Sequence, residues 1–221
     1  MPSPSQQIAR LHSLIPEGVK LLAVSKFHPA EAIADAYVGG QRLFGESRAQ
    51  ELAAKAQVLP EDICWHFIGH LQTNKVKQVV EHASVIESID SLKLLHAVDE
   101  AARRSGKVVG VLLQVHVARE ETKFGFLPEE MTEAAAEAKH LEGVKLLGVM
   151  GMASNTDDQS RVASDFKAIR GCFDSLRAGV MAGCEDFTIV SMGMSGDWPL
   201  AVECGSNLVR IGSDIFGVRN Y

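Results

Sequence analysis

Residues 20–46 have the sequence KLLAVSKFHPAEAIADAYVGGQRLFGE, which contains one complete unit of strand, helix and strand. The apolar run Lys20–Ser25 predicts a β-strand. Pro29 suits the first turn of the helix that follows, where a missing N–H removes no hydrogen bond. That helix, Pro29–Val38, stops at two glycines, and Arg42–Gly45 is the next predicted strand. Such units build parallel sheets with helices packed on them.

The same alternation continues along the whole chain. Further strands are predicted at Cys64–Gly69, Ser84–Ser88, Val108–Val117, Lys145–Met150, Phe187–Ser191 and Asn207–Ile211. Helices are predicted at Glu46–Gln57, Thr73–His82, Pro128–Leu141 and Trp198–Cys204, and another begins at a cap formed by Asp90 or Ser91 and ends at Arg104. A further helix is predicted because apolar residues from Val162 to Leu176 recur at helical spacing and form one apolar stripe. Eight strands without a linker favour a single (β/α)8 TIM barrel spanning residues 1–221 as one domain. An open doubly wound sheet has the same alternation and remains an alternative at this point.

Composition narrows the class of protein. The chain carries a net charge of −6, which argues against binding to nucleic acid or to an anionic membrane surface. Its 4 cysteines form no CxxC pair and no cluster with zinc spacing, so no metal site is expected. No secretory signal and no apolar run long enough to span a membrane occur, and we therefore expect a cytoplasmic protein.

In a barrel of this kind, functional residues follow the carboxyl ends of the strands. Lys26 comes directly after the first strand, where a partly desolvated amine could attack a carbonyl and form a Schiff base. On position alone, a solvated lysine at a strand end is the more favoured interpretation.

The loops after the last two strands are rich in glycine and serine: SMGMSGD at residues 191–197 and RIGSDIFG at residues 210–217. Barrels often bind phosphate at these two loops, through backbone N–H groups and the start of a short helix. Ordinary turn chemistry is the alternative, because glycine and serine are common in any loop.

Arg210 lies inside the last predicted strand, between Val209 and Ile211. A charge in that place must be paired or must face a polar ligand. One partner would be the ring nitrogen of a bound pyridoxal phosphate (PLP). The competing interpretation is a structural salt bridge to Glu203 or Glu46.

Six ordered sequence blocks between about Lys20 and Tyr221 closely resemble those of the PLP homeostasis protein family, which has a barrel like the N-terminal domain of alanine racemase. The blocks are AVSKFHP (23–29), FGESRAQE (44–51), WHFIGHLQTNK (65–75), EETKFG (120–125), SMGMSGD (191–197) and VRIGSDIFG (209–217).

The resemblance implies that Lys26 carries PLP as a Schiff base. It further implies that the phosphate is held by Ser195, Gly212 and Ser213, and that Arg210 faces the pyridine nitrogen. An arginine there keeps that nitrogen unprotonated, so the ring is a poorer electron sink. The remaining cofactor contacts expected from the resemblance are Met194 and Ser47.

The chain departs from the family pattern in three places. Ser47 stands where the family usually has Asn, which weakens the expected contact there. His116 also replaces an Asn and is interpreted as a satisfied core histidine. Residues 151–153, Gly-Met-Ala, are the third departure. None of the three is expected to touch Lys26, Arg210 or the phosphate loops.

Two functions from different classes follow from these residues. The first is a non-catalytic protein that buffers PLP or delivers it to apo PLP-dependent enzymes, as a monomer or weak homodimer. The second is a small PLP-dependent amino-acid racemase, whose chemistry needs a second base such as a tyrosine from another domain. The chain has only Tyr37, on a predicted helix, and Tyr221. The eight predicted units use nearly all residues, so we expect the first function. For Lys123, a transient acceptor of PLP and a solvated loop lysine are the two interpretations.

Overall fold

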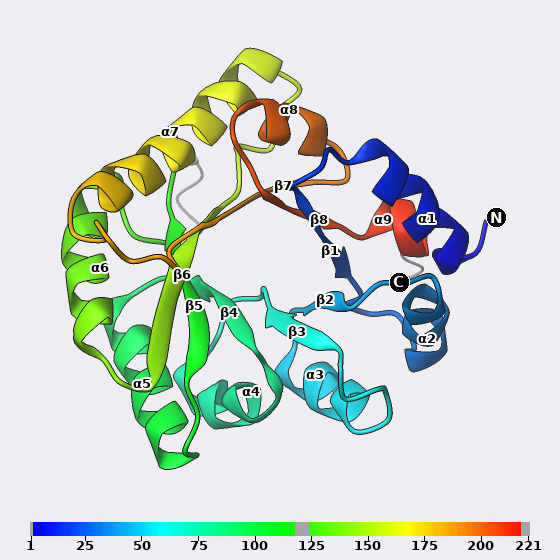
Figure 1. Ribbon diagram of the computed structural model, residues 1–221, viewed down its shortest axis with the longest axis horizontal. Coiled ribbons are helices and arrows are strands. Elements are labelled where there is room, and N and C mark those ends of the chain that lie inside the picture. Colours follow the sequence, from blue (N-terminus) through cyan, green and yellow to red (C-terminus); the bar gives the residue numbers. More distant parts are fainter. Residues whose placement is uncertain (1, 118–123, 218–221) are drawn as a thin grey trace.

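The computed structural model describes residues 2–117 and 124–217. Within these residues, eight strands pair in parallel in the order β1 to β8, and β8 pairs with β1 to close the barrel (Figure 1). The strands are β1 (Lys20–Val24), β2 (Leu43–Glu46), β3 (Cys64–Phe67), β4 (Val85–Ile89), β5 (Val109–Val115), β6 (Val144–Gly151), β7 (Ile189–Met194) and β8 (Leu208–Ile211). The predicted (β/α)8 barrel is therefore confirmed, and the open sheet is excluded.

Helices surround the ring of strands (Figure 1). They are α1 (Pro4–Leu14), α2 (Ala30–Val38), α3 (Ala49–Ala56), α4 (Val76–His82), α5 (Leu92–Arg104), α6 (Met131–His140), α7 (Gln159–Ala178), α8 (Trp198–Glu203) and α9 (Ser213–Phe216), with 3₁₀ turns η1 (Thr73–Lys75) and η2 (Pro128–Glu130). Ser91 is the cap of α5, as predicted, because its hydroxyl accepts a hydrogen bond from the Leu94 N–H. Helix α3 begins three residues later than predicted, since Glu46 pairs with Phe67 as part of the sheet.

Helix α1 was not predicted, although its start carries a recognisable signal. The Ser3 hydroxyl accepts from the Gln6 N–H and the Gln6 side chain accepts from the Ser3 N–H, which is a capping box. Pro4 occupies the first helical position, where proline is favoured.

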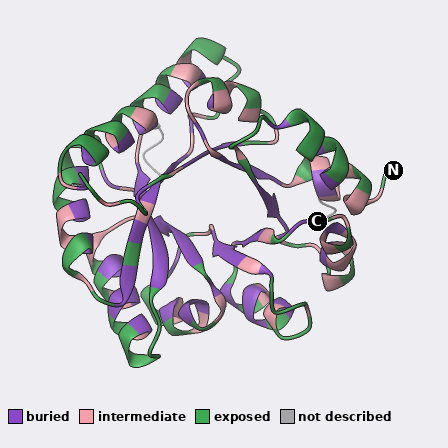
Figure 2. Cartoon of the chain, in the orientation of Figure 1, coloured by how far each residue is buried: buried purple, intermediate pink, exposed green. Residues whose placement is uncertain are grey.

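The layer between the strands and the helices is mainly apolar. The predicted stripe on α7 is confirmed, because Val162, Phe166, Ile169, Phe173 and Leu176 are all buried. Figure 2 shows the same division around the ring: the strands are mostly buried, and the helices have buried inner faces and exposed outer faces. One continuous cluster of buried apolar residues fills this layer.

The inside of the barrel has a different composition. Side chains alternate between the two faces of a strand, so every second residue points inward. Val85, Leu112 and Met150 form a small separate apolar cluster there. The other inward positions include charged and polar residues, described below.

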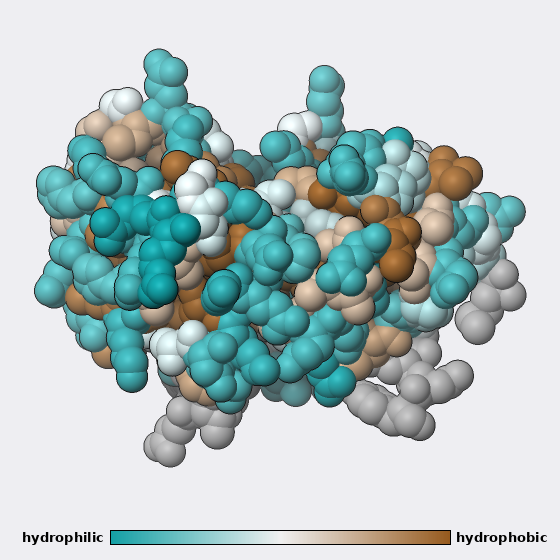
Figure 3. All heavy atoms as spheres, turned by 90° about the horizontal axis from the view of Figure 1, so that it is seen from below, coloured by the Kyte–Doolittle hydropathy of each residue, from teal (hydrophilic) through white to brown (hydrophobic). Residues whose placement is uncertain are grey.

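Hydrophilic residues predominate on the side of the molecule drawn in Figure 3, with hydrophobic residues visible in small areas between them. None of the helices in residues 2–117 and 124–217 is long and apolar enough to cross a membrane.

Candidate functional site

A cavity of about 420 Å³ opens at the carboxyl ends of the strands. Six of the residues predicted to bind a cofactor line it: Lys26, Met194, Ser195, Arg210, Gly212 and Ser213. The other lining residues are Val24, His28, Ile68, Met152, Gly196 and Gly217. The closed barrel brings these segments together because the ends of β1, β7 and β8 are neighbours in the sheet.

Lys26 is half-buried and follows β1 with one residue between them. The chain turns sharply at this point, because the His28 N–H donates to the Ser25 carbonyl at 3.1 Å. Phe27, inside this turn, has a φ of 68°, a left-handed conformation that is rare for a residue with a side chain. The turn places both Lys26 and His28 on the wall of the cavity.

The two glycine- and serine-rich loops also meet at this cavity. The Gly212 N–H donates to the Ser195 hydroxyl at 3.3 Å, which joins the loop after β7 to the loop after β8. Gly193 has a φ of 94°, and a Cβ there would lie 2.6 Å from the Cβ of Ala201, so this close approach requires glycine. Helix α9 begins at Ser213, and the first N–H groups of a helix have no acceptor within the helix.

Arg210 lies at the base of the cavity and is 5% exposed. Its Nη1 donates to the Ser191 hydroxyl at 2.6 Å, and its Nη2 donates to the Gly151 carbonyl at 2.8 Å. The Ser191 hydroxyl in turn bonds Oε2 of Glu87 at 2.6 Å, which lies 3.9 Å from Nη1 of Arg210. The buried His66 bonds Oε1 of the same carboxylate through Nδ1 at 2.6 Å.

The salt-bridge partners predicted for Arg210 were wrong: the carboxylate near it is Glu87, not Glu46 or Glu203. Glu46 bonds Lys55 on α3, which lies outside the barrel, whereas Arg210 faces the interior. Residues 151–153 were also expected to leave Arg210 untouched, and the Gly151 carbonyl contacts it directly. That contact is made by a backbone carbonyl, which every residue type has, so the residue type at 151 could not indicate it.

Burial and mutual contacts determine the pKa values of His66, Glu87 and Arg210. Burial by itself lowers the pKa of His66, but hydrogen bonds with Cys64 and Glu87 and the charge of Glu87 outweigh it and raise that pKa to about 9. Burial raises the pKa of Glu87, yet His66 and Arg210 together hold it below its usual value. Burial also lowers the pKa of Arg210, and the charge of Glu87 opposes that shift. The base of the cavity is therefore a carboxylate between two cationic side chains.

Glu87 and His66 were missed by the sequence reasoning. Glu87 had a visible signal, since it is a charge within the predicted strand Ser84–Ser88, the same argument that singled out Arg210. His66 lies in the aromatic run CWHF, where a histidine gives no indication of which face it occupies.

Several predicted residues lie elsewhere. Ser47 lines a separate pocket of about 200 Å³, together with Arg48, His70 and Lys75. The interpretation of His116 as a core histidine was wrong, because it is only half-buried; it follows β5 and is not among the residues that line the main cavity. Lys123 lies outside the described residues. In the part of the chain that the structure describes, no group of three or more His, Cys, Asp or Glu could hold a metal ion.

The residues of the cavity fit PLP. Lys26 would supply an amine for its aldehyde, and Arg210 would supply a cation for its ring. The hydroxyls of Ser195 and Ser213 and the start of α9 would supply hydrogen-bond donors for its phosphate. Gly196 and Gly217 have open space where a side chain would stand. A volume of about 420 Å³ is within the range usual for small-molecule sites.

Comparison with known proteins gives the same picture. Residues 5–220 match the family model described as alanine racemase, N-terminal domain. The pyridoxal phosphate homeostasis protein of Haemophilus influenzae is 38% identical over 206 residues, which are 92% of this chain and 86% of that protein. The protein of the same name in Schizosaccharomyces pombe is 38% identical over 204 residues, which are 91% of this chain and 84% of the relative.

Solved structures extend the comparison. PipY of Synechococcus elongatus PCC7942 is 37% identical and covers 97% of this chain and 100% of its own, with a TM-score of 0.92 without PLP and 0.88 with PLP bound. Alanine racemase from E. faecalis, at 18% identity and a TM-score of 0.77, shares the fold over 98% of this chain but only 58% of its own. The matched positions cover nearly the whole barrel, and the chain belongs to the pyridoxal phosphate homeostasis protein family, whose fold is that of the alanine racemase N-terminal domain.

Proposed function

We propose that this protein binds PLP as a Schiff base on Lys26 and acts in PLP homeostasis, as a buffer or donor of the cofactor without efficient catalysis. The observation that carries the proposal is the cavity itself, where Lys26, Arg210 and the loops of Ser195 and Ser213 converge from β1, β7 and β8. The names of the curated relatives and the PLP-bound structure of PipY support the same cofactor.

Each residue has a definite task in this proposal. The Lys26 amine bonds the aldehyde carbon, while the Ser195 and Ser213 hydroxyls and the backbone at Gly212 hold the phosphate. Met194 lies beside them at the rim of the cavity, where its side chain can cover the ligand. When bound, PLP supplies an electron sink for amino-acid chemistry, and the Arg210 cation limits this by keeping the ring nitrogen unprotonated.

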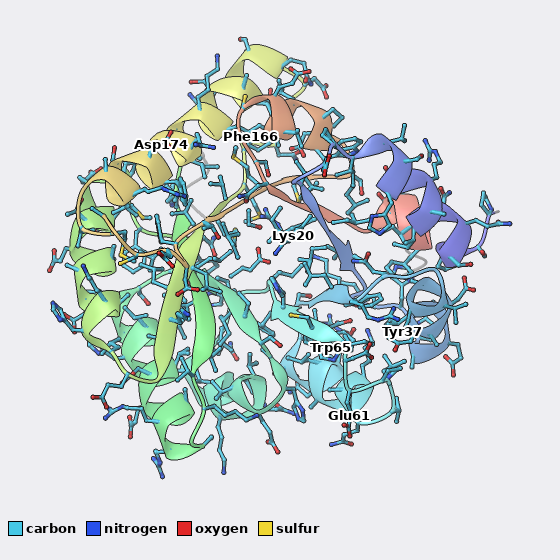
Figure 4. All side chains as sticks on the ribbon, viewed as in Figure 1. Lys20, Tyr37, Glu61, Trp65, Phe166 and Asp174 are labelled. Atoms are coloured by element: carbon cyan, nitrogen blue, oxygen red, sulfur yellow. The ribbon has the colours of Figure 1, made fainter. Side chains whose placement is uncertain are left out.

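The racemase alternative needs a second base on the opposite face of the substrate. Tyr37 cannot serve, because it lies on α2 outside the ring of strands, where its hydroxyl bonds Asp62 at 2.8 Å (Figure 4). Tyr221 lies outside the described residues. His28 is the lining residue that could accept a proton, and its ring stacks on that of Phe216 with centroids 5.0 Å apart. The alternative is therefore testable at His28.

The proposed function is tested by loading the purified protein with PLP and recording its visible spectrum. Borohydride should bleach the chromophore and leave the cofactor on the Lys26 peptide, and Lys26→Ala should abolish this covalent capture. A Lys26→Ala protein that still captures PLP irreversibly would overturn the assignment.

Delivery and catalysis are measured in parallel on the same loaded protein. It is mixed with an apo PLP-dependent enzyme and a trap for free PLP, while racemisation of several L-amino acids is assayed separately. We expect the enzyme to be loaded and racemisation to be absent. Turnover of about 1 per second or more, typical of enzymes, that disappears in His28→Asn would instead establish the racemase.

The setting of this function is part of the proposal. We propose that one barrel domain, residues 1–221, works in the cytoplasm as a monomer or weak homodimer, with apo PLP-dependent enzymes as its protein partners.

A further inference from the structure

The backbone on both sides of Lys26 is tied to helix α3. The carbonyl of Ser25 accepts a hydrogen bond from Nζ of Lys55 at 3.0 Å. The N–H of Phe27 donates to Oε2 of Glu51 at 2.8 Å. These two groups belong to the two peptide planes that flank the α-carbon of Lys26. Holding both planes fixes the φ and ψ angles of Lys26, and with them the direction in which its side chain leaves the backbone.

Lys55 is built into the protein as a fixed donor. It is 8% exposed, and its ammonium group donates to Glu46 at 2.7 Å and to Glu51 at 3.3 Å, as well as to Ser25. An ammonium has three hydrogens, and these three contacts use all of them. Lys55 therefore holds neighbouring groups in place and is not a second amine that could bond an aldehyde.

Glu46 holds Lys55 from the barrel side. Its carboxylate is fully buried, and its Oε1 accepts from both Lys55 and the Ser25 hydroxyl, the latter at 2.6 Å. Burial raises the pKa of Glu46, while the charge of Lys55 opposes the rise. Lys55 and Ser25 thus share one anchoring oxygen.

The turn at Phe27 needs such support. Its φ of 68° is disfavoured for any residue with a Cβ. The bond to Glu51 holds this conformation, and the guanidinium of Arg48 lies 4.4 Å from the centre of the Phe27 ring. Arg48 also approaches Oε1 of Glu51 at 3.6 Å, so one end of α3 covers the whole turn.

We propose that Lys55 and Glu51 form an α3 clamp, a pair of positioning residues that aim the Lys26 amine into the cavity. The clamp touches neither the cavity nor the ligand, and it rests on the proposed function only in that Lys26 must be the residue that bonds PLP. Its effect falls on the bond to the aldehyde, because the phosphate and ring contacts come from β7 and β8.

Two ligands separate this role from a structural one. PLP can bond Lys26, whereas pyridoxine 5′-phosphate has an alcohol in place of the aldehyde and cannot. Lys55→Met should weaken PLP by about tenfold, the scale of one charge-assisted hydrogen bond, and should slow borohydride-trapped capture on Lys26. The affinity for pyridoxine 5′-phosphate should stay as in the wild type. Lys55→Arg, which keeps a cationic donor, should recover part of the loss.

Lys77→Met is the matched control, since Lys77 is exposed on α4 and should leave both affinities unchanged. Removing Lys55 leaves Glu46 buried without its cation, so the double variant Lys55→Met/Glu46→Gln provides a neutral, folded counterpart with the clamp still broken. It should show the same selective loss of PLP affinity.

Equal losses for both ligands, or no loss of PLP affinity in a folded variant, would overturn the clamp. A wild-type protein that binds neither ligand, or a Lys26→Ala protein that binds PLP as the wild type does, would instead overturn the proposed function and the clamp with it.

Discussion

The inside of the barrel and the layer between its strands and helices are both shielded from water, yet they are built from different chemistry. The outer layer is mainly a continuous apolar cluster, in which residues such as Phe44, Phe166 and Phe187 are fully buried. The ion pair between Glu46 and Lys55 at α3 is a charged exception within it. Within the described residues, the separate inner cluster has three buried apolar members, while Arg210, Ser191, Glu87 and His66 are bonded in a row beside it. Buried ion pairs add little to stability compared with apolar packing. The difference therefore indicates that the outer layer supplies most of the stability of the fold. The interior network instead fixes the position of Arg210 beneath the cavity.

The largest loss of stability should come from replacing Glu87, the residue at the centre of the network formed by His66, Glu87, Ser191 and Arg210. Glu87→Leu leaves Arg210 and His66 buried without their counter-charge, so we expect a loss of about 3–5 kcal/mol in the free energy of unfolding. Ile86→Val, at the adjacent position facing the outer layer, should cost about 1 kcal/mol. Denaturant titration measures both.

The double variant Glu87→Leu/Arg210→Met separates charge from packing. It removes the unpaired guanidinium and should recover part of the stability lost in Glu87→Leu. A double variant less stable than Glu87→Leu would show that Arg210 contributes mainly through packing.

Replacing His66 should cause a smaller loss of stability, and this loss should depend on pH. Its pKa rises from 6.5 to about 9 in the folded protein, so folding favours the protonated form. The resulting stabilisation, about 3 kcal/mol, is fully present below pH 6.5 and is lost as the pH rises through about 9. The gap in stability between the wild type and His66→Gln should therefore narrow over this range.

Thermal unfolding at several pH values measures that gap. His140→Gln is the control, because His140 is exposed on α6 and should show no such dependence. A gap that does not narrow between about pH 6 and pH 10 would mean that folding does not raise the pKa of His66, and the charge assigned to the interior would be wrong.

The smallest effect should come from the loops at the mouth of the interior. Ser195→Ala and Ser213→Ala each remove one neutral donor, so each should weaken PLP by about 1 kcal/mol and leave the stability of the unliganded protein nearly unchanged. Pyridoxal, which lacks the phosphate, should bind far more weakly than PLP to the wild type. Equal affinity for pyridoxal and PLP would show that these loops do not hold a phosphate.

Much of the fold could be predicted because its signals are local. Strands such as Val109–Val115 are rich in branched apolar residues, and the α7 stripe repeats with the helical period. The boundaries were less accurate: β7 runs to Met194, three residues beyond its predicted end, because glycine at 193 does not interrupt it. Helix α1 was overlooked even though its capping box is visible in the sequence.

The site could be predicted only in part. Lys26 and the two loops follow strands, a position that the barrel topology makes functional. The partners of Arg210 could not be predicted, since Glu87 comes from β4 and depends on which face of each strand points inward. Lys55 had no sequence signal either, because the three groups that it contacts come together only when α3 packs on the barrel.

The bond between Glu87 and Ser191 joins β4 to β7, two strands that are not neighbours in the sheet and lie 104 residues apart in sequence. It thus ties the first half of the barrel to the second across the middle. Contacts with so large a separation in sequence are costly to close and form late in folding. The first half of the barrel (β1–β4) and the second half (β5–β8) should accordingly open together rather than one after the other. Hydrogen exchange of the amides of β4 and β7 should therefore report one common free energy of opening.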